Sequence, residues 1–113
     1  MIVSKQNAEH YTWAENCDGW HLLKSDSLSV IQERMPSGTH EVLHYHIKAQ
    51  QVFFILSGRA VIEIEGIEYE LKAHESIAIK NGLKHKITNA SLEDLHFLVI
   101  SEPKSHGDRV NVI

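Results

Sequence analysis

GTHEVLHYHIKAQQVFFILSG, residues 38–58, is a strand-like segment in which two histidines stand one residue apart. In an extended strand, side chains at i and i+2 point to the same face about 7 Å apart, so the imidazoles of His44 and His46 can converge on one metal ion. Residues 51–56 follow as a short apolar run with two phenylalanines and two β-branched residues, which is typical of a buried strand. Taken alone, the histidine pair is half a site, and a surface placement explains it equally well.

Alternation of apolar and polar residues continues on both sides of this segment. It predicts strands, in addition to residues 51–56, over residues 27–35, 60–65, 67–72, 77–79, 85–89 and 95–100. Turn signals separate them at Pro36-Ser37-Gly38, Ser57-Gly58, Glu65-Gly66, Asn81-Gly82 and Asn89-Ala90-Ser91. No segment has the apolar spacing of a long amphipathic helix. Because an open sheet of many short strands would leave exposed edges, we predict an all-β sandwich or closed barrel.

Length and composition indicate one folded domain over residues 1–113. The chain is 42% hydrophobic and 23% charged, which is ordinary for a globular protein and does not favour disorder. The tail, residues 102–113, is polar, and we expect it to be loosely attached. Its last apolar residues, at 110, 112 and 113, alternate enough to allow a final docked strand instead.

Charge and hydropathy argue against two classes of partner. The formal net charge is −4, with lysines and arginines scattered, so we expect no nucleic-acid binding. No run approaches the roughly 20 apolar residues of a membrane span, and the start of the sequence lacks the features of a secretion signal, so we expect no membrane partner. The single cysteine, Cys17, cannot form an internal disulfide, which fits a cytoplasmic location.

Residues 38–58 resemble the first motif of the cupin superfamily, G-x5-H-x-H-x4-E-x6-G. Every fixed position matches except one, where Gln51 replaces the usual Glu. The second motif, G-x5-P-x-G-x2-H-x3-N, is similar to residues 74–89, HESIAIKNGLKHKITN. There Gly82, His85 and Asn89 match, whereas the usual Gly and Pro are replaced by His74 and Lys80.

The two motifs together cover residues 38–89, and the resemblance implies a single cupin domain. Its fold would be a double-stranded β-helix, a jelly-roll barrel in which the first-motif side chains and the second-motif histidine meet in the lumen. The replacements at His74 and Lys80 fall at turn positions and bear on local loop geometry more than on the fold.

The resemblance also implies the metal ligands. His44, His46 and His85 become imidazole ligands of one divalent ion, and Gln51 takes the carboxylate position through its carbonyl oxygen. Because this ligand set is neutral, we expect weaker binding and a more strongly Lewis-acidic ion than with Glu. Nitrogen and oxygen ligands suit Ni, Zn, Fe, Mn or Cu alike. A vestigial site that holds little metal is the alternative.

Three further residues are expected beside the metal. Phe53 and Ile55 share a strand face with Gln51 and should line an apolar pocket wall, and Asn89 lies four residues past His85 on the same face, next to the pocket or in a turn. Glu41 is expected to face outward, which leaves no carboxylate base inside the site.

The sequence leaves two classes of function open. The first is a metal-dependent enzyme, such as a dioxygenase or an isomerase, acting on a small oxygen-rich ligand that is sugar-like or a carboxylate. The second is a barrel that binds or senses such a ligand without catalysis. In both, we predict a homodimer, because the outward residues of two strands are apolar and need cover: Val52, Phe54, Leu56, Leu98 and Ile100. Cover by the N-terminal segment of the same chain is the alternative.

Overall fold

Eleven β-strands and no helix make up residues 1–112, the part of the chain that the computed structural model describes. The strands are β1 Glu9–Trp13, β2 Cys17–Lys24, β3 Ser29–Met35, β4 His44–His46, β5 Gln50–Ser57, β6 Arg59–Ile64, β7 Ile67–Lys72, β8 Ser76–Ile79, β9 His85–Thr88, β10 Leu95–Glu102 and β11 Arg109–Asn111. None of the described residues forms a helix that could span a membrane. The all-β prediction is confirmed.

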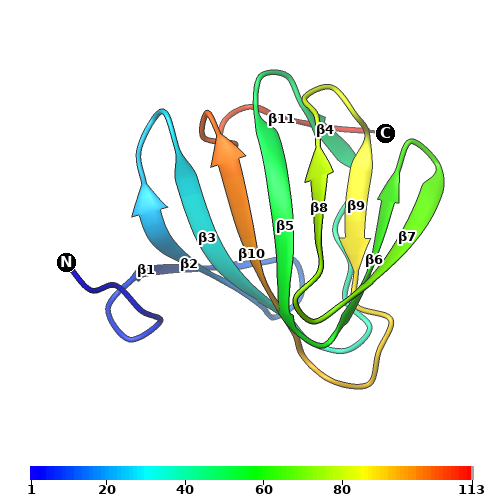
Figure 1. The fold of residues 1–113 in the computed structure, drawn as a ribbon, viewed down its shortest axis with the longest axis horizontal. Coiled ribbons are helices and arrows are strands. Elements are labelled where there is room, and N and C mark those ends of the chain that lie inside the picture. Colours follow the sequence, from blue (N-terminus) through cyan, green and yellow to red (C-terminus); the bar gives the residue numbers. More distant parts are fainter. Residues whose placement is uncertain (113) are drawn as a thin grey trace.

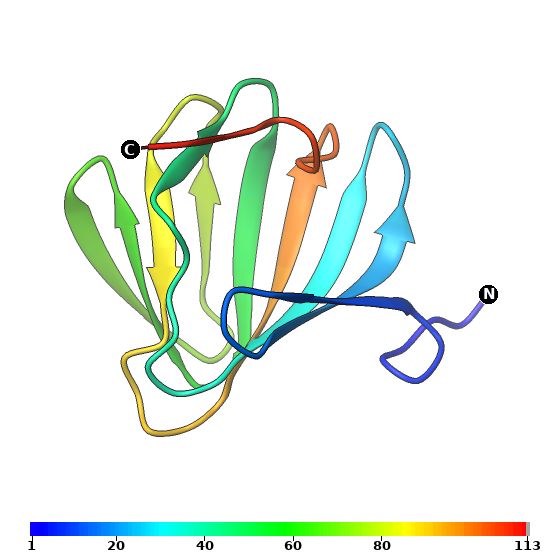
Figure 2. The same ribbon diagram turned by 180° about the vertical axis from the view of Figure 1, so that it is seen from behind.

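The strands form two antiparallel sheets that curl toward each other. One sheet has six strands in the order β1-β2-β3-β10-β5-β8, and the other has five in the order β11-β4-β9-β6-β7. Figures 1 and 2 show the two sheets folded around a common interior, with β11 and β4 at one end of the barrel. Strands distant in sequence are neighbours, for example β3 and β10, so the fold is the jelly-roll barrel that the motifs implied.

Side chains that face the interior form layers across β3, β10 and β5. One layer is Ser29, Ser101 and Gln51, the next is Ile31, Val99 and Phe53, and the third is Glu33, Phe97 and Ile55. The hydrophobic core lies around the third layer and beyond it, where Met35, Leu95, Phe97 and Ile55 are all fully buried. The interior is therefore closed and apolar at one end and carries polar groups toward the other.

Two expectations about strands need correction. Strands β1 and β2 were not predicted, because β1 is polar on its exposed positions and β2 is interrupted by Gly19. In β7, the alternation of Ile67 and Tyr69 with glutamates is typical of a half-buried strand, yet these two residues are 58% and 42% exposed. The strand is at the edge of its sheet, and only its end near Leu71 lies over the core.

The C-terminal tail forms a docked strand, which is one of the two alternatives that the sequence left open. Strand β11 pairs with β4, so that Arg109 lies opposite His46 and Asn111 opposite His44. The carboxylate of Asp108 also accepts hydrogen bonds from the backbone nitrogens of Lys48 and Ala49, both at 2.9 Å. The tail is thus held against the histidine strand. Ile113 lies outside the described residues.

Candidate metal centre

Three histidines meet at one end of the barrel. His44 and His46 lie on β4 and His85 opens β9, where it is paired directly with His44 across the two strands. All three side chains are buried, and their ligand atoms lie within 4.8 Å of one another. The ring centroids of His44 and His85 are 4.4 Å apart, and those of His44 and His46 are 5.1 Å apart. The strand spacing therefore brings the two motifs together as a cluster that can hold a metal ion.

Backbone carbonyls fix the orientation of two of these rings. His44 Nδ1 donates to the Val42 carbonyl at 2.8 Å, and His85 Nδ1 donates to the Leu83 carbonyl at 2.9 Å. Each ring then presents its Nε2 lone pair, the arrangement by which proteins orient metal-ligating histidines. Burial lowers the pKa of His44 to about 3 and that of His46 to about 4, with neighbouring cationic groups contributing less. Both rings are neutral near pH 7, which is the form that binds metal.

Gln51 presents a carbonyl oxygen in the same region. Its amide nitrogen donates to the hydroxyl of Ser101 at 3.0 Å, across the β5–β10 pairing, and this bond fixes the amide. Its Oε1 is buried without a hydrogen-bond partner among residues 1–112, and so are His85 Nε2 and His46 Nδ1. Unpaired buried polar atoms are costly, and an ion ligated by these residues would satisfy several of them at once. The residues present therefore fit a divalent metal with nitrogen and oxygen ligands.

A cavity of about 310 Å³ adjoins this cluster. It is lined by Tyr11, Trp13, Ile31, Glu33, Glu41, His44, His46, Gln51, Phe53, Val99, Ser105, His106, Gly107 and Arg109. The loop after β10 and strand β11 supply the last four of these residues, for which the motifs gave no signal. The site thus includes the tail as well as the barrel walls.

The three expected pocket residues lie in three different surroundings. Phe53 lines the cavity beside the histidines. Ile55, one layer further in, is fully buried in the hydrophobic core and does not border the cavity. Asn89 clamps a turn, because its amide donates to the carbonyls of Met35 at 2.8 Å and Glu93 at 2.7 Å. We therefore assign Ile55 to the core and Asn89 to the turn in place of the pocket.

Two carboxyl groups line the cavity, and the expectation that Glu41 faces outward was wrong. The Glu41 side chain is only 10% exposed; its Oε1 accepts from the backbone nitrogen of Ile87 at 3.1 Å, and its Oε2 is 3.9 Å from Arg109. Glu33 shares the inward face of β3 with Ile31 and Met35. Burial raises the pKa of Glu33 to about 7 and that of Glu41 to about 8. The cavity therefore contains groups able to exchange protons near neutral pH.

The Tyr11 side chain crosses β2 at Gly19, which has no side chain, and reaches Glu33 on β3. Tyr11 on β1 pairs with Gly19 on β2, and Gly19 pairs with Glu33 on β3. The Tyr11 hydroxyl donates to Glu33 Oε2 at 2.8 Å. A Cβ atom at Gly19 would lie 2.3 Å from the Tyr11 ring, so only glycine leaves room for the ring to lie over β2. This explains the interruption in β2 that hid the strand from sequence analysis.

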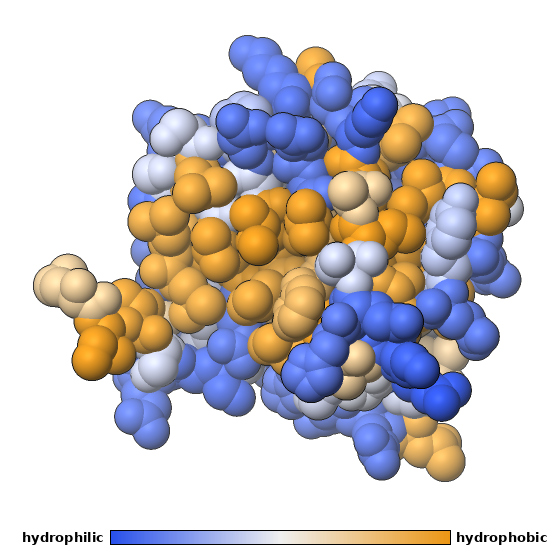
Figure 3. Space-filling view, viewed as in Figure 1, coloured by the Kyte–Doolittle hydropathy of each residue, from blue (hydrophilic) through white to orange (hydrophobic). Residues whose placement is uncertain are grey.

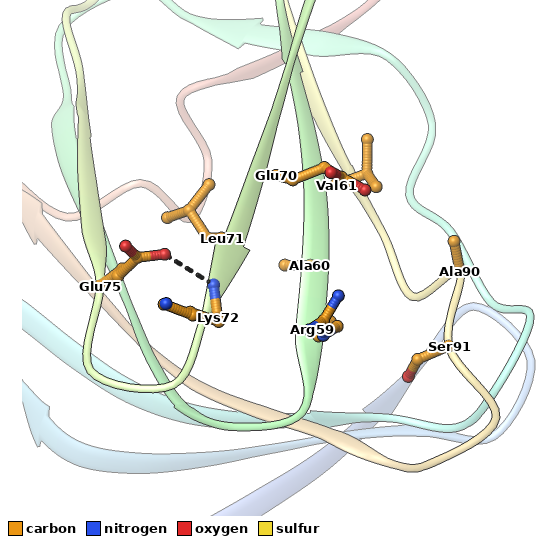
Figure 4. Close-up of a pocket in the computed structure, with 9 residues that line it drawn as sticks. All are labelled: Arg59, Ala60, Val61, Glu70, Leu71, Lys72, Glu75, Ala90 and Ser91. Atoms are coloured by element: carbon orange, nitrogen blue, oxygen red, sulfur yellow. Dashed lines mark hydrogen bonds between the residues drawn. The ribbon is translucent and has the colours of Figure 1, made fainter.

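A second cavity lies away from the histidines. Figure 4 shows it around the start of β6 and the end of β7, with Arg59, Lys72 and Glu75 among its lining residues. The side chain of Glu75 accepts a hydrogen bond from the backbone nitrogen of Lys72 at 2.9 Å. His85 pairs with Ile64 at the other end of β6. Because no histidine lines this cavity, the candidate site is the one at the β4 end.

Comparison with known proteins gives a consistent picture. A family model described as "Cupin domain" matches residues 31–101. The chain is 29% identical over 89 residues to an uncharacterised protein of Methanocaldococcus jannaschii, covering 78% of this chain and 71% of that protein. It is 27% identical over 85 residues to the oxalate-binding protein of Thermotoga maritima, covering 71% and 70% respectively. The solved structure of KdgF from Halomonas sp. has the same fold, with a TM-score of 0.84 at 12% identity over 92% of this chain and 94% of that one.

Proposed function

The chain belongs to the cupin family, and from this premise we propose that it binds one divalent transition metal and holds a small oxygen-rich ligand against it. The observation that carries the proposal is the convergence of His44, His46 and His85, whose ligand atoms lie within 4.8 Å of one another beside a cavity of about 310 Å³. An apolar residue would pack better than a buried imidazole at each of these positions, so packing alone does not explain the three histidines. The metal is Ni, Zn, Fe, Mn or Cu.

The four ligand residues would hold the ion, with Gln51 contributing its free Oε1. When bound, the ion would act as a Lewis acid toward ligand oxygens, and the neutral ligand set would leave its charge undiminished. An anionic or chelating ligand end is therefore attracted to this part of the cavity. The T. maritima relative is named an oxalate-binding protein, and this supports a small carboxylate or a comparable oxygen-rich compound as the ligand.

A metal-dependent enzyme is the second candidate, and the carboxyls favour it. Proton transfer in an isomerase or a related enzyme needs a base in the cavity, and Glu33 and Glu41 both line it.

A cytoplasmic location stays a prediction, which the free, buried thiol of Cys17 supports.

The test of the proposed function is metal content and its effect on stability. Protein purified without a metal-affinity tag and dialysed against each candidate metal is expected to retain about one ion per chain by elemental mass spectrometry. Because an ion that binds only the folded chain stabilises it, a chelator should lower the thermal midpoint by several degrees. Metal content near zero with every candidate ion would overturn the proposal in favour of a vestigial site.

We also propose that two copies associate through the outer face of the six-stranded sheet. Figure 3 shows a broad apolar area on this face, seen from the same side as Figure 1. Its residues on β3, β5 and β10 are half-buried in the single chain: Val30, Val52, Phe54, Leu56, Leu98 and Ile100. The N-terminal segment lies at the outer edge of the sheet, with Lys5 over the Trp20 ring, and leaves β5 and β10 uncovered. A second copy of this face is the surface whose apolar character matches it.

Light scattering at micromolar concentration is expected to give twice the chain mass of 12.9 kDa. Phe54→Glu places a charge at the centre of the face and should yield monomer. Leu92→Glu, at a loop residue that is 96% exposed outside this face, is the matched control and should remain dimeric. A wild-type mass of 12.9 kDa would contradict the proposed dimer.

A further inference from the structure

We propose that the ligand of this cavity carries a hydroxyl group at the end opposite the histidines, that Glu33 accepts a hydrogen bond from this hydroxyl, and that a ligand with a second carboxylate there is rejected. The inference rests on the proposed function, because it takes the other end of the ligand to face the metal centre. It assigns a selecting role to Glu33, Tyr11 and Glu41, which lie outside the ligand set.

The cavity has two distinct polar ends. Gln51 lies in the same layer as Ser101, whereas Glu33 lies in the layer of Phe97, two layers along the strands. Two layers are four residues, which is about 13 Å along the strand direction. The layer between them is apolar and contributes Ile31, Val99 and Phe53 to the cavity wall. A ligand that fills the cavity therefore has one end near the histidines and the other near Glu33.

Glu33 has one carboxylate oxygen left for a ligand. Its Oε2 accepts the hydrogen bond from Tyr11, which holds the group in place, while Oε1 accepts none from any residue that the structure describes. The Tyr11 ring is itself fixed by its position over Gly19. A fixed acceptor in a partly apolar cavity favours a ligand with a hydrogen-bond donor at this point. The hydrogen bond then offsets the free-energy cost of removing the acceptor and the donor from water.

Charge at this end disfavours an anion. Glu33 and Glu41 both line the cavity, and the one lining residue with a permanent positive charge, Arg109, is already engaged. Its Nε donates to Asn111 Oδ1 at 2.8 Å, a terminal nitrogen donates to the Val42 carbonyl at 3.3 Å, and the other lies 3.9 Å from Glu41. At pH 8, above the pKa of Glu33, a ligand carboxylate placed here would face the ionised Glu33 and the Glu41 carboxyl, with no unengaged cation among the lining residues, and like charges repel.

The cavity size limits the ligand. At about 30 Å³ for each water-sized group, a volume of about 310 Å³ admits on the order of ten non-hydrogen atoms. A four-carbon acid with several hydroxyls matches this size. Its carboxylate and neighbouring hydroxyl suit the metal end, and its terminal hydroxyl suits Glu33. A dicarboxylate as short as oxalate uses both ends to chelate one ion and does not reach Glu33, so the distinguishing probe must be longer.

Threonate and tartrate are matched probes, since they differ only in a terminal hydroxymethyl group against a carboxylate. Calorimetric titration of the metal-loaded protein at pH 8 is expected to show at least tenfold tighter binding of threonate. Glu33→Gln removes the charge and supplies an amide that can donate to a carboxylate, so this preference should fall to less than threefold. Glu68→Gln, at an exposed residue of β7, is the matched control and should keep the wild-type preference.

Metal content is measured on every sample before titration, so that the two failures can be told apart. Equal metal in wild type and Glu33→Gln, with the preference lost only in the variant, supports the inference. If the wild type holds metal but binds both probes equally, binds neither, or keeps its preference in Glu33→Gln, the inference is overturned while the proposed function stands. A wild type without metal overturns the proposed function and the inference with it.

Discussion

His46→Ala protein, prepared beside the wild type with the same added metal, is expected to contain only trace metal. The substitution removes one of three buried imidazoles whose ligand atoms lie within 4.8 Å of one another, and two remaining histidines cannot hold the ion with useful affinity. The barrel should stay folded, because the hydrophobic core lies around Phe97 and Ile55, away from β4. Elemental mass spectrometry gives the metal content and far-ultraviolet circular dichroism checks the fold.

His40→Ala is the matched control for this loss. His40 is an exposed histidine close to His44 in sequence and lies outside the cluster, so its removal should leave metal content at the wild-type level. Equal metal content in the wild type and His46→Ala would refute the proposed ligands.

Gln51→Glu is expected to shift metal affinity in the opposite direction. A carboxylate oxygen then takes the place of the unpaired Oε1, and the Ser101 hydroxyl, which accepts from Gln51, can turn to donate to it. Adding one negative charge beside a divalent ion should tighten binding by tenfold or more, after the cost of burying the charge. Competition against a chelator of known affinity measures the change, and an affinity equal to that of the wild type would remove Gln51 from the ligand set.

The sequence predicted the metal cluster well because its information is local. Strand geometry alone brings His44 and His46 together, whereas His85 was implied by the resemblance of residues 74–89 to the second cupin motif, and the β4–β9 pairing places it opposite His44. The fold followed from the same motifs and from the regular turns. Alternation within single strands was enough for the all-β class, and the motif resemblance supplied the jelly-roll fold and the third histidine.

The other polar end of the cavity could not be predicted in the same way. Glu33 shares the parity of Ile31 and Met35, so an inward position was readable, but parity does not say whether an inward side chain meets a packed core or open space. That depends on Tyr11 and Gly19, which reach Glu33 through two further strand pairings. Arg109 enters the cavity because the tail docks on β4, a contact between segments about 60 residues apart that no local pattern encodes.

Glu33→Gln is expected to change how the stability of the metal-free protein depends on pH. Burial raises the pKa of Glu33 to about 7 from the 4.5 of an ordinary glutamate, so the folded chain keeps a proton that the unfolded chain has lost. The contribution of the protonated Glu33 to the free energy of unfolding is fully present below pH 4.5. It is lost as the pH rises from 4.5 through the folded-state pKa of about 7. A shift of this size corresponds to about 3 kcal/mol. Gln resembles the protonated form and has no such loss, and removing the Glu33 charge also lessens the rise in the pKa of Glu41.

Urea unfolding at pH 5 and pH 8, in the presence of a chelator, measures this effect directly. The free energy of unfolding of Glu33→Gln minus that of the wild type should be about 2.5 kcal/mol larger at pH 8 than at pH 5, because the wild type loses stability over this range and the variant does not. The buried histidines and Arg109 are common to both proteins, so their contributions largely cancel in the difference. Glu68→Gln, which alters an exposed glutamate on β7, should follow the wild type at both pH values. If Glu33→Gln also follows the wild type, Glu33 is solvated in the folded chain and the polar end of the cavity opposite the histidines is not shielded from water.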